Sequence, residues 1–329
     1  MNKVLLLGLG PTALTALESL AQRFEVIGVV RAVVDGEDDR TLARRAAELS
    51  VPVLADVDPA SVESVVEAAR PDCTVVSSYN RILRPSLLQR CPFVNVHYAP
   101  LPAYRGRANV NWAIINGEAE AAISIHVIEP GLDDGNILFQ EAVPLGPDDT
   151  VSDVYHRLNE VQRRELGRTV ERYLEGFAGR PQDGAESSYG CTRVEEDGEI
   201  SWSASTTAVY ALVRALAPPY PRAFTYLGTR RLAIVRAAPS PSGRRFVGRV
   251  PGRVVERSTS TGHVDVLTGD GALRIHEVRV GDGGEVVPAA TVITSTRQTL
   301  GLRSADLLAR IEELERRLGE VGRPDLPGS

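Results

Sequence analysis

Residues 93–107 read FVNVHYAPLPAYRGR, a short apolar run followed by a proline-rich loop. Side-chain character alternates over Phe93–His97, and a period of two predicts a β-strand. Asn95 and His97 then project from the same face of that strand, and Pro100 stops it. The stretch therefore predicts an amide and an imidazole side by side at the carboxyl end of a strand, the edge at which open α/β sheets bind ligands.

The N-terminal half alternates between strand-like and helix-like segments. Runs rich in Val, Ile and Leu occupy residues 3–9, 26–30, 51–54, 73–78 and 93–97. Segments with helical periodicity lie between them, at 12–23, 39–49 and 60–70. This alternation predicts an α/β fold with a Rossmann-like, doubly wound parallel sheet. Two further strands, 122–129 and 136–144, flank the turn-rich loop PGLDDG, and a helix over about 151–177 follows.

The composition changes after residues 178–188, a polar segment with Gly and Pro that we interpret as a linker. Beyond it, short strand-like pieces alternate with turn signals about every ten residues, which predicts a small barrel or sandwich. We expect three parts, with boundaries at 1–185, 190–300 and 301–329.

The last part contains an amphipathic helix. Its apolar residues recur at spacings of four, three and four, at Leu307, Ile311, Leu314 and Leu318. Two heptads are too short to form a stable coiled coil alone. Packing on its own domain and a homodimer contact therefore both stay open.

Bulk composition indicates a globular protein of 329 residues, with 43% hydrophobic and 24% charged residues. The chain lacks the run of about 18 apolar residues that a membrane span needs, and its start has no basic region or cleavage site of a signal peptide. Three scattered cysteines, Cys73, Cys91 and Cys191, argue against both a disulfide framework and a zinc site. We expect a soluble, cytoplasmic protein with no membrane partner.

The net charge of −6 argues against broad nucleic-acid binding. One segment is an exception, because Arg222–Arg257 holds nine arginines and a single acid, Glu256. Lys3 is the only lysine, so the many arginines reflect a composition bias, and their number is weak evidence for a binding surface.

The stretch GLGPTA, residues 8–13, fits the G-x-G-x-x-A pattern of dinucleotide binding. The acid that should end the second strand and bind the ribose is replaced by Arg31. Pro11 also removes an N–H that would help to hold a pyrophosphate. We interpret the stretch as a tight strand-to-helix turn and expect no NAD(P), although Arg31 would suit the 2′-phosphate of NADP.

Asp133 follows His97 by 36 residues and completes a larger pattern. The pattern is N-x-H, a proline-bracketed loop with Arg-Gly-Arg, and L-D-x-G between two strands. With it, the chain resembles the 10-formyltetrahydrofolate-dependent formyltransferases, which include glycinamide ribonucleotide, methionyl-tRNA and amino-sugar formyltransferases. Residues 101–120, LPAYRGRANVNWAIINGEAE, are most similar to the amino-sugar members of the polymyxin-resistance type. Residues 218–237, PPYPRAFTYLGTRRLAIVRA, resemble the second, oligonucleotide-binding-like barrel of the same group.

The resemblance implies a catalytic trio of Asn95, His97 and Asp133. Asn95 and His97 would donate hydrogen bonds to the tetrahedral oxyanion. Asp133 would raise the pKa of His97 and relay protons through a bound water. Asp133 is preferred to Asp134 because it holds the family's position two residues before the glycine.

The resemblance also implies a folate site after the fourth strand and no metal. The candidates there are Tyr79, Asn80, Arg81, Ile82 and Leu83. Four histidines match no motif position and are expected to be structural: His126, His156, His263 and His276.

Four residues after the proline turn are candidates for binding the amine substrate: Arg105, Arg107, Asn109 and Trp112. Two arginines at the mouth of a site suit a phosphate or diphosphate, so a nucleotide-linked amino sugar is the first choice. Initiator methionyl-tRNA is the alternative that the arginine-rich segment favours and the net charge opposes. Another natural-product amine, such as hydroxyornithine, stays open. The intact trio argues against a silent folate or nucleotide sensor, because a binding module needs no proton relay.

Overall fold

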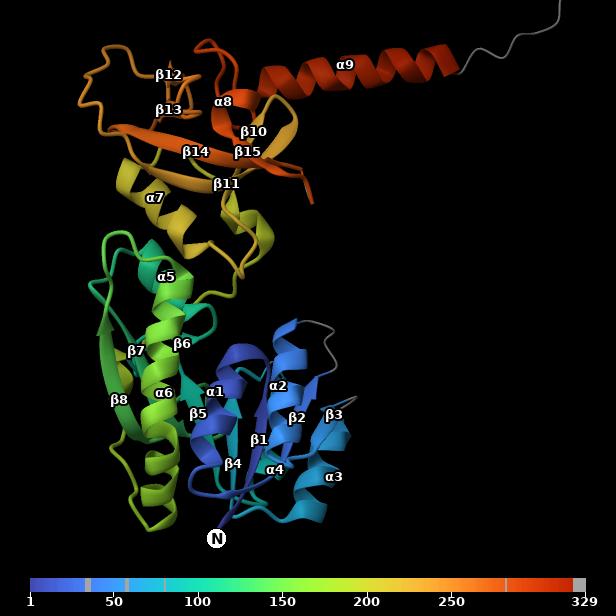
Figure 1. Ribbon diagram of the computed structural model, residues 1–329, viewed down its shortest axis with the longest axis vertical. Helices are drawn as coiled ribbons and strands as arrows, with labels where there is room; N and C mark the ends of the chain where they lie inside the picture. Colours follow the sequence, from blue (N-terminus) through green and yellow to red (C-terminus); the bar gives the residue numbers. More distant parts are fainter. Residues whose placement is uncertain (33–36, 57–58, 80, 282, 322–329) are drawn as a thin grey trace, which may run out of the picture. The chain divides into compact units, whose positions relative to one another are not determined.

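The computed structural model (Figure 1) describes residues 1–32, 37–56, 59–79, 81–281 and 283–321. The chain divides into two compact units. The first comprises Met1–Ala113 and Glu118–Arg193, and the second comprises Ile114–Gly117 and Val194–Ser329. Each unit is built around its own main β-sheet.

In the described residues, the main sheet of the first unit has seven strands. In spatial order they are β3 (Val53–Asp56), β2 (Glu25–Ala32), β1 (Lys3–Gly8), β4 (Cys73–Ser77), β5 (Phe93–His97), β7 (Glu120–Val127) and β8 (Ile137–Pro144). The first five are parallel, whereas β7 is antiparallel to both β5 and β8. The predicted α/β, mainly parallel architecture is confirmed. The β7–β8 hairpin departs from a fully parallel sheet because its short loop cannot form the crossover that parallel neighbours need.

Helices cover this sheet (Figure 1). They are α1 (Gly10–Leu20), α2 (Glu37–Glu48), α3 (Pro59–Ala69), α4 (Pro85–Leu88), α5 (Asn109–Ile115) and α6 (Val151–Leu174). Leu5 and Leu7 of β1 pack with Val66 of α3 and Leu87 of α4. Leu6 faces the opposite side, because neighbours in a strand alternate, and on that side α1 packs against α6. With both faces covered, polar side chains gather at the ends of the strands.

The long helix α6 begins where the sequence predicts. Thr150 is its N-cap: Thr150 Oγ1 accepts a hydrogen bond from the Asp153 N–H at 3.4 Å, and Asp153 Oδ2 accepts one from the Thr150 N–H at 2.9 Å. This capping box satisfies N–H groups that the first turn of a helix leaves unpaired.

Residues 178–190, here called the strap, belong to the first unit. Arg180 exchanges two backbone hydrogen bonds with Ile137 at the start of β8. After a short 3₁₀ turn (Gly184–Glu186), β9 (Tyr189–Gly190) pairs in parallel with β6 (Arg105–Gly106). The prediction of a linker was wrong, because polar composition does not distinguish a free linker from a segment whose backbone pairs with its neighbours.

The second unit contains a curled antiparallel sheet. In spatial order its strands are β10 (Phe224–Leu227), β11 (Arg230–Pro239), β14 (Ala272–Val280), β13 (Val264–Leu267) and β12 (Val254–Arg257), and β15 (Val286–Pro288) also pairs with β14. Leu227 bridges Leu300, and Arg253 beside β12 bridges Thr299. These bridges join the two edge strands through one segment, which closes the sheet into the predicted small barrel.

The helices of the second unit are α7 (Thr206–Ala215), α8 (Ala289–Val292) and α9 (Ser304–Val321), and a 3₁₀ turn (Glu195–Gly198) precedes them. The terminal helix predicted from the sequence is thus present as α9. Across the described part of the chain, no helix combines the length and apolarity needed to cross a membrane.

Candidate active site

His97 lies at the carboxyl end of β5 with its side chain buried. Its Nε2 is 2.8 Å from the carbonyl oxygen of Tyr104 and 3.0 Å from Nδ2 of Asn109. The two contacts make opposite demands, because a carbonyl oxygen needs a proton on Nε2 whereas an amide N–H needs a lone pair there. We assign the proton to Nε2 on the shorter contact, to Tyr104, and Asn109 Nδ2 then donates to the Gly106 carbonyl at 3.2 Å instead. In neutral His97, Nδ1 is therefore the unprotonated nitrogen.

Asp133 lies in the loop between β7 and β8, next to that nitrogen. Its Oδ2 accepts the backbone N–H of Gly106 at 2.9 Å and is 3.6 Å from His97 Nδ1. Asn95 Nδ2 is 3.5 Å from the other carboxylate oxygen, Oδ1. The structure thus brings the three sequence-selected residues into one cluster, although their catalytic roles stay a prediction. Asp134, the alternative acid, is exposed.

His126 also belongs to this cluster, whereas the sequence predicts only a structural role for it. Its Nε2 is 3.1 Å from Asn95 Nδ2 and 3.5 Å from Asp133 Oδ1, and its Nδ1 donates to the Val127 carbonyl at 2.8 Å. The reason is the register of β5 and β7, which places His126 directly opposite Asn95. No spacing in the sequence reveals which residues two strands place opposite each other.

Burial and neighbouring charges set the protonation states of the cluster. Burial lowers the pKa of His97 below its ordinary value of 6.5, and this effect exceeds the opposite effects of the Asp133 charge and the Tyr104 carbonyl. Asp133 thus raises the pKa of His97 as predicted, but burial outweighs it and the net shift is downward. Burial would raise the pKa of Asp133, but hydrogen bonding to His126, the charge of His97 and the Gly106 N–H lower it to about 2. At neutral pH the cluster holds a carboxylate beside a neutral imidazole.

The backbone around the cluster adopts conformations that side chains disfavour. Three non-glycine residues have positive φ angles: Tyr104 at 57°, Ala108 at 60° and Asp133 at 49°. Gly106, which lies between Tyr104 and Ala108 in the chain, has a φ of 96°. Such residues persist only where the surrounding structure fixes them, and they concentrate at functional sites. Here they direct the Tyr104 carbonyl and the Gly106 N–H toward His97 and Asp133.

Gln182 of the strap connects two loops of the site. Its Nε2 donates to the carbonyl oxygens of Asp133 and Gly135, both at 2.8 Å, and its Oε1 accepts from Arg105 Nη2 at 2.8 Å. Arg105 is buried. The structure therefore corrects the placement of Arg105 at the open mouth of the site: this side chain holds the strap against the loop of Asp133.

Two models of known protein families match this chain. A model described as formyl transferase matches residues 27–170, and a model described as formyl transferase, C-terminal domain, matches residues 194–297. This chain belongs to the formyltransferase family. The cluster of this formyltransferase lies in the first match and its barrel in the second, so the resemblance found in the sequence is confirmed.

Solved structures share the fold of this formyltransferase at low sequence identity. HypX from Aquifex aeolicus, in complex with tetrahydrofolic acid, matches with a TM-score of 0.62 and 19% identity over 90% of this chain and 47% of HypX. The N-formyltransferase from Helicobacter canadensis, solved with folinic acid and dTDP-3-aminofucose, matches with a TM-score of 0.64 and 20% identity over 84% and 98% of the two chains. WlaRD, a sugar 3N-formyl transferase, matches with a TM-score of 0.61 and 17% identity over 86% and 98%. The chain spans about half the length of HypX.

The residues predicted to hold the folate follow β4, the parallel neighbour of β5. Tyr79 and Leu83 pack against the apolar core beneath the loop, and Arg81 is half-buried. Ile82 projects into solvent with 96% of its surface exposed. Asn80 lies outside the described residues. The loop thus has two apolar anchors and one exposed apolar side chain.

The other substrate-site candidates occupy different environments. Arg107 is exposed and Asn109 is buried beside His97. Trp112 donates Nε1–H to the Cys191 carbonyl at 2.7 Å, and the guanidinium of Arg193 lies 5.1 Å from its ring centre. Asn109 and Trp112 are thus held by protein contacts, and their roles in binding stay predictions.

The glycine-rich turn of residues 8–13 has a packing explanation. A Cβ on Gly8 would lie 2.2 Å from the backbone oxygen of Ser77, so only glycine permits this approach of β1 to β4. The Thr12 carbonyl accepts a hydrogen bond at 2.9 Å from Gln162, which is fully buried. These contacts fit the interpretation as a strand-to-helix turn, and the absence of NAD(P) stays a prediction.

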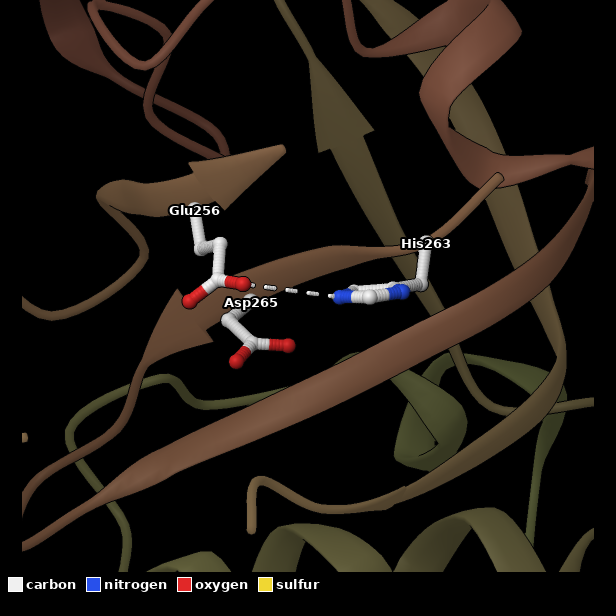
Figure 2. Close-up of side chains that lie close together, drawn as sticks. All are labelled: Glu256, His263 and Asp265. Atoms are coloured by element: carbon white, nitrogen blue, oxygen red, sulfur yellow. Dashed lines mark ion pairs between the residues drawn. The ribbon is translucent and has the colours of Figure 1, made fainter. Parts of the chain in front are cut away.

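A second histidine–carboxylate cluster lies in the barrel (Figure 2). Glu256 Oε1 is 3.8 Å from His263 Nε2, and Asp265 lies beside both. The two oxygens of Asp265 accept hydrogen bonds from Arg274 at 2.7 and 2.9 Å, because β13 and β14 place these residues opposite each other. Arg274 already neutralises the charge of Asp265, the carboxylate that a metal ion would have to bind. We therefore interpret the cluster as a cross-strand ion network.

Proposed function

We propose that this chain transfers the formyl group of 10-formyltetrahydrofolate to the primary amine of a nucleotide-linked amino sugar. The observation that carries the proposal is the cluster of Asn95, His97 and Asp133 at the carboxyl end of β5. It offers a hydrogen-bond donor, a proton acceptor and a fixed negative charge, and formyl transfer to an amine requires all three.

In this proposal His97 is the proton acceptor. The bound folate supplies the formyl carbon, and the protein supplies the groups that move protons and balance charge. Tyr104 holds the Nε2–H of His97, so the proton of the attacking amine goes to Nδ1, directly or through a water. The imidazolium formed lies 3.6 Å from Asp133 Oδ2, and that carboxylate stabilises it. Nδ1 then holds the proton that the leaving nitrogen requires.

Asn95 is the proposed donor to the formyl oxygen, on which negative charge develops. An amide nitrogen carries two N–H bonds, and His126 occupies one of them at 3.1 Å. The other makes only a long contact of 3.5 Å with Asp133, which a substrate oxygen can replace. His126 therefore orients the amide, and one such donor contributes about 2–4 kcal/mol to lowering the barrier.

The loop after β4 fits the ring system of a folate. Since β4 and β5 are parallel neighbours, this loop leaves the sheet beside His97. Ile82 is exposed there while Tyr79 and Leu83 anchor the loop to the core. An exposed apolar side chain on a loop that follows the neighbouring strand suits a planar ring with polar edges. We therefore assign Ile82 to the folate site.

Arg107 and Trp112 support a nucleotide-linked amine. Arg107 is exposed in the loop that leads from β6 to α5, and a guanidinium matches the oxygens of a diphosphate. Trp112 lies on α5 a short way along the chain, and a base would stack on the face of its ring that Arg193 does not cover. The Helicobacter canadensis enzyme, solved with dTDP-3-aminofucose, and WlaRD, solved with dTDP, share this fold.

The arginine-rich segment gives the tRNA alternative less support than its composition implies. Seven of its nine arginines contact other groups of the chain. Arg231, Arg236 and Arg244 pair with Glu195, Glu277 and Glu256. Arg222, Arg249, Arg253 and Arg257 donate to backbone carbonyls or to a threonine hydroxyl. Arginines held by such contacts must break them to bind RNA phosphates, which weakens a surface of this kind.

The test is tetrahydrofolate release from 10-formyltetrahydrofolate with dTDP- and UDP-linked amino sugars, charged initiator tRNA and hydroxyornithine in parallel. We expect turnover with a nucleotide-linked sugar. Arg107→Ala should raise KM for that sugar by about tenfold or more, because a charge-assisted contact to the diphosphate is lost. Arg245→Ala, at an exposed arginine of the arginine-rich segment, is the matched control and should leave KM unchanged.

Each other outcome contradicts a stated part of the proposal. Turnover with tRNA alone, sensitive to Arg245→Ala and not to Arg107→Ala, would replace the sugar by tRNA. Turnover with hydroxyornithine alone would replace it by an amine without a nucleotide. Absence of both turnover and folate binding would overturn the assignment of the activity.

A further inference from the structure

The terminal helix α9 exposes a continuous apolar face. Its five large apolar side chains, Leu307, Leu308, Ile311, Leu314 and Leu318, are between 41% and 71% exposed. The second formyl transferase model ends at residue 297, before this helix begins. A single helix of this length is only marginally stable in water, so its apolar face needs a partner that the family domains do not explain.

We propose that α9 is a dimerisation helix that pairs in parallel with α9 of a second copy of this chain. The inference goes beyond formyl transfer and does not depend on it. Leu307 and Leu314 take position d of a heptad, and Ile311 and Leu318 take position a. Among parallel coiled coils, Ile at a with Leu at d, as at Ile311, favours two strands. Because these side chains are exposed and not packed on the helix's own barrel, the pattern fits a second copy.

The charges beside the apolar face select the same orientation. Arg310 and Arg317 take position g, and Glu315 takes position e. In a parallel pair, position g of one heptad faces position e of the next heptad on the partner, so Arg310 of each copy meets Glu315 of the other. In an antiparallel pair that aligns the four seam residues, g faces g and e faces e, so Arg310 meets Arg317 of the partner and Glu315 meets Leu308. Only the parallel pair is complementary.

The size of the face sets the strength of the pairing. Five partly exposed aliphatic side chains on each helix bury less than the about 800 Å² per partner of a standard stable interface. We therefore expect a dimer that dissociates on dilution, with about half of the protein dimeric in the range of tens of micromolar.

Sedimentation velocity of the full-length protein at about 1–200 µM tests the pairing. The wild-type protein should shift from monomer to dimer over this range. Leu314→Glu places a charge in the centre of the seam and should raise the dissociation constant by about 100-fold or more. Ala309→Glu adds the same charge at position f on the outer face, and should change the constant by less than about threefold. Both side chains are exposed, so neither variant should alter thermal unfolding of the monomer.

A charge reversal tests the orientation. Arg310→Glu turns two attractive contacts of the parallel pair into repulsive ones and should weaken the dimer by about 5- to 30-fold. Adding Glu315→Arg to that variant restores both contacts, and the constant should return to within about threefold of the wild type. An antiparallel pair would instead be strengthened or unchanged by Arg310→Glu.

Three results would overturn the proposal. The first is a protein that stays monomeric up to the highest concentration. The second is a dimer that persists in the Leu314→Glu variant, since another surface would then form it. The third is a dimer that Arg310→Glu does not weaken, since the helices would then not be parallel.

Discussion

Each unit of this chain contains a histidine beside carboxylates, and the two clusters differ in what balances the negative charge. In the described part of the chain, the only ionisable side chains that lie within 4 Å of the Asp133 carboxylate are two histidines, His97 and His126. Asp265 instead accepts two hydrogen bonds from Arg274 and one from the Ser240 hydroxyl. The first carboxylate acts on an imidazole, whereas the second is already neutralised by a guanidinium.

The comparison teaches that a shifted pKa does not by itself identify a site. The pKa of Asp133 and the pKa of Asp265 are both lowered, although burial opposes the shift in each case. Arg274 contributes most to the lowering in the barrel, while His126 and His97 contribute most at the end of β5. The backbone differs as well: Asp133 has a φ of 49° in a loop, and Asp265 sits in the regular pairing of β13 with its neighbours.

The largest effect that we expect is on stability, in the barrel. Asp265 is 1% exposed, so Asp265→Asn leaves the partly buried Arg274 with only the longer contact to Glu256, at 3.9 Å. Breaking one partner of such a pair should lower the free energy of unfolding by about 3–5 kcal/mol. Denaturant unfolding followed by Trp202 fluorescence would measure it, since Trp202 lies in the core of the barrel. At temperatures at which the variant stays folded, kcat should remain within about twofold of the wild type, and a larger drop would mean that the barrel cluster takes part in the reaction.

The next effect is on the rate, at the end of β5. Asp133→Asn keeps the size of the side chain, and asparagine tolerates the positive φ of this position. Loss of the charge should lower kcat by about 100- to 1,000-fold, with little change in unfolding. Asp134→Asn alters the exposed neighbouring carboxylate and should have less than about a twofold effect. Equal losses in the two variants would show that the loop, and not the charge on Asp133, matters.

The same variant makes a prediction about pH. His97 must be neutral to accept a proton, and its pKa lies below 6.5, so kcat/KM should fall as the pH drops through that lower value. Asp133 is a cause that raises this pKa, and its removal should move the fall to still lower pH. A fall that stays in place would show that His97 does not control the rate.

The positions of individual strands and helices were predictable from local sequence patterns. The strand Phe93–His97 lies where alternation places it, and the helix α6 begins at Val151, where the sequence predicts its start. The meeting of Asn95, His126 and Asp133 was not predictable. It depends on the register of β5 and β7 and on the contact of the strap with the loop of Asp133, and both join residues that are far apart in the sequence. Burial likewise reverses the expected shift of the pKa of His97, and burial is known only once the fold is known.

A smaller effect on the rate should follow from His126, the residue that sequence alone missed. His126→Gln removes the ring nitrogen that accepts the Asn95 N–H at 3.1 Å, so the amide loses its fixed orientation. One misplaced neutral hydrogen bond should cost about tenfold in kcat and leave KM within about twofold. His156→Gln is the matched control, because His156 is exposed on α6 and pairs only with the nearby Glu160 among the described residues. A tenfold rise in KM with unchanged kcat would assign His126 to binding instead.

The smallest effect should come from His263, which completes the comparison. Arg274 already places a positive charge beside Glu256 and Asp265, so a divalent cation between them would be repelled. Zinc chloride or a chelator should therefore leave both thermal unfolding and kcat unchanged within error, and His263→Gln should change kcat by less than about twofold. A zinc-dependent rise in the unfolding temperature that disappears in His263→Gln would show that the barrel cluster binds metal. In that case, pairing of a carboxylate with arginine would not be enough to identify a cluster as structural.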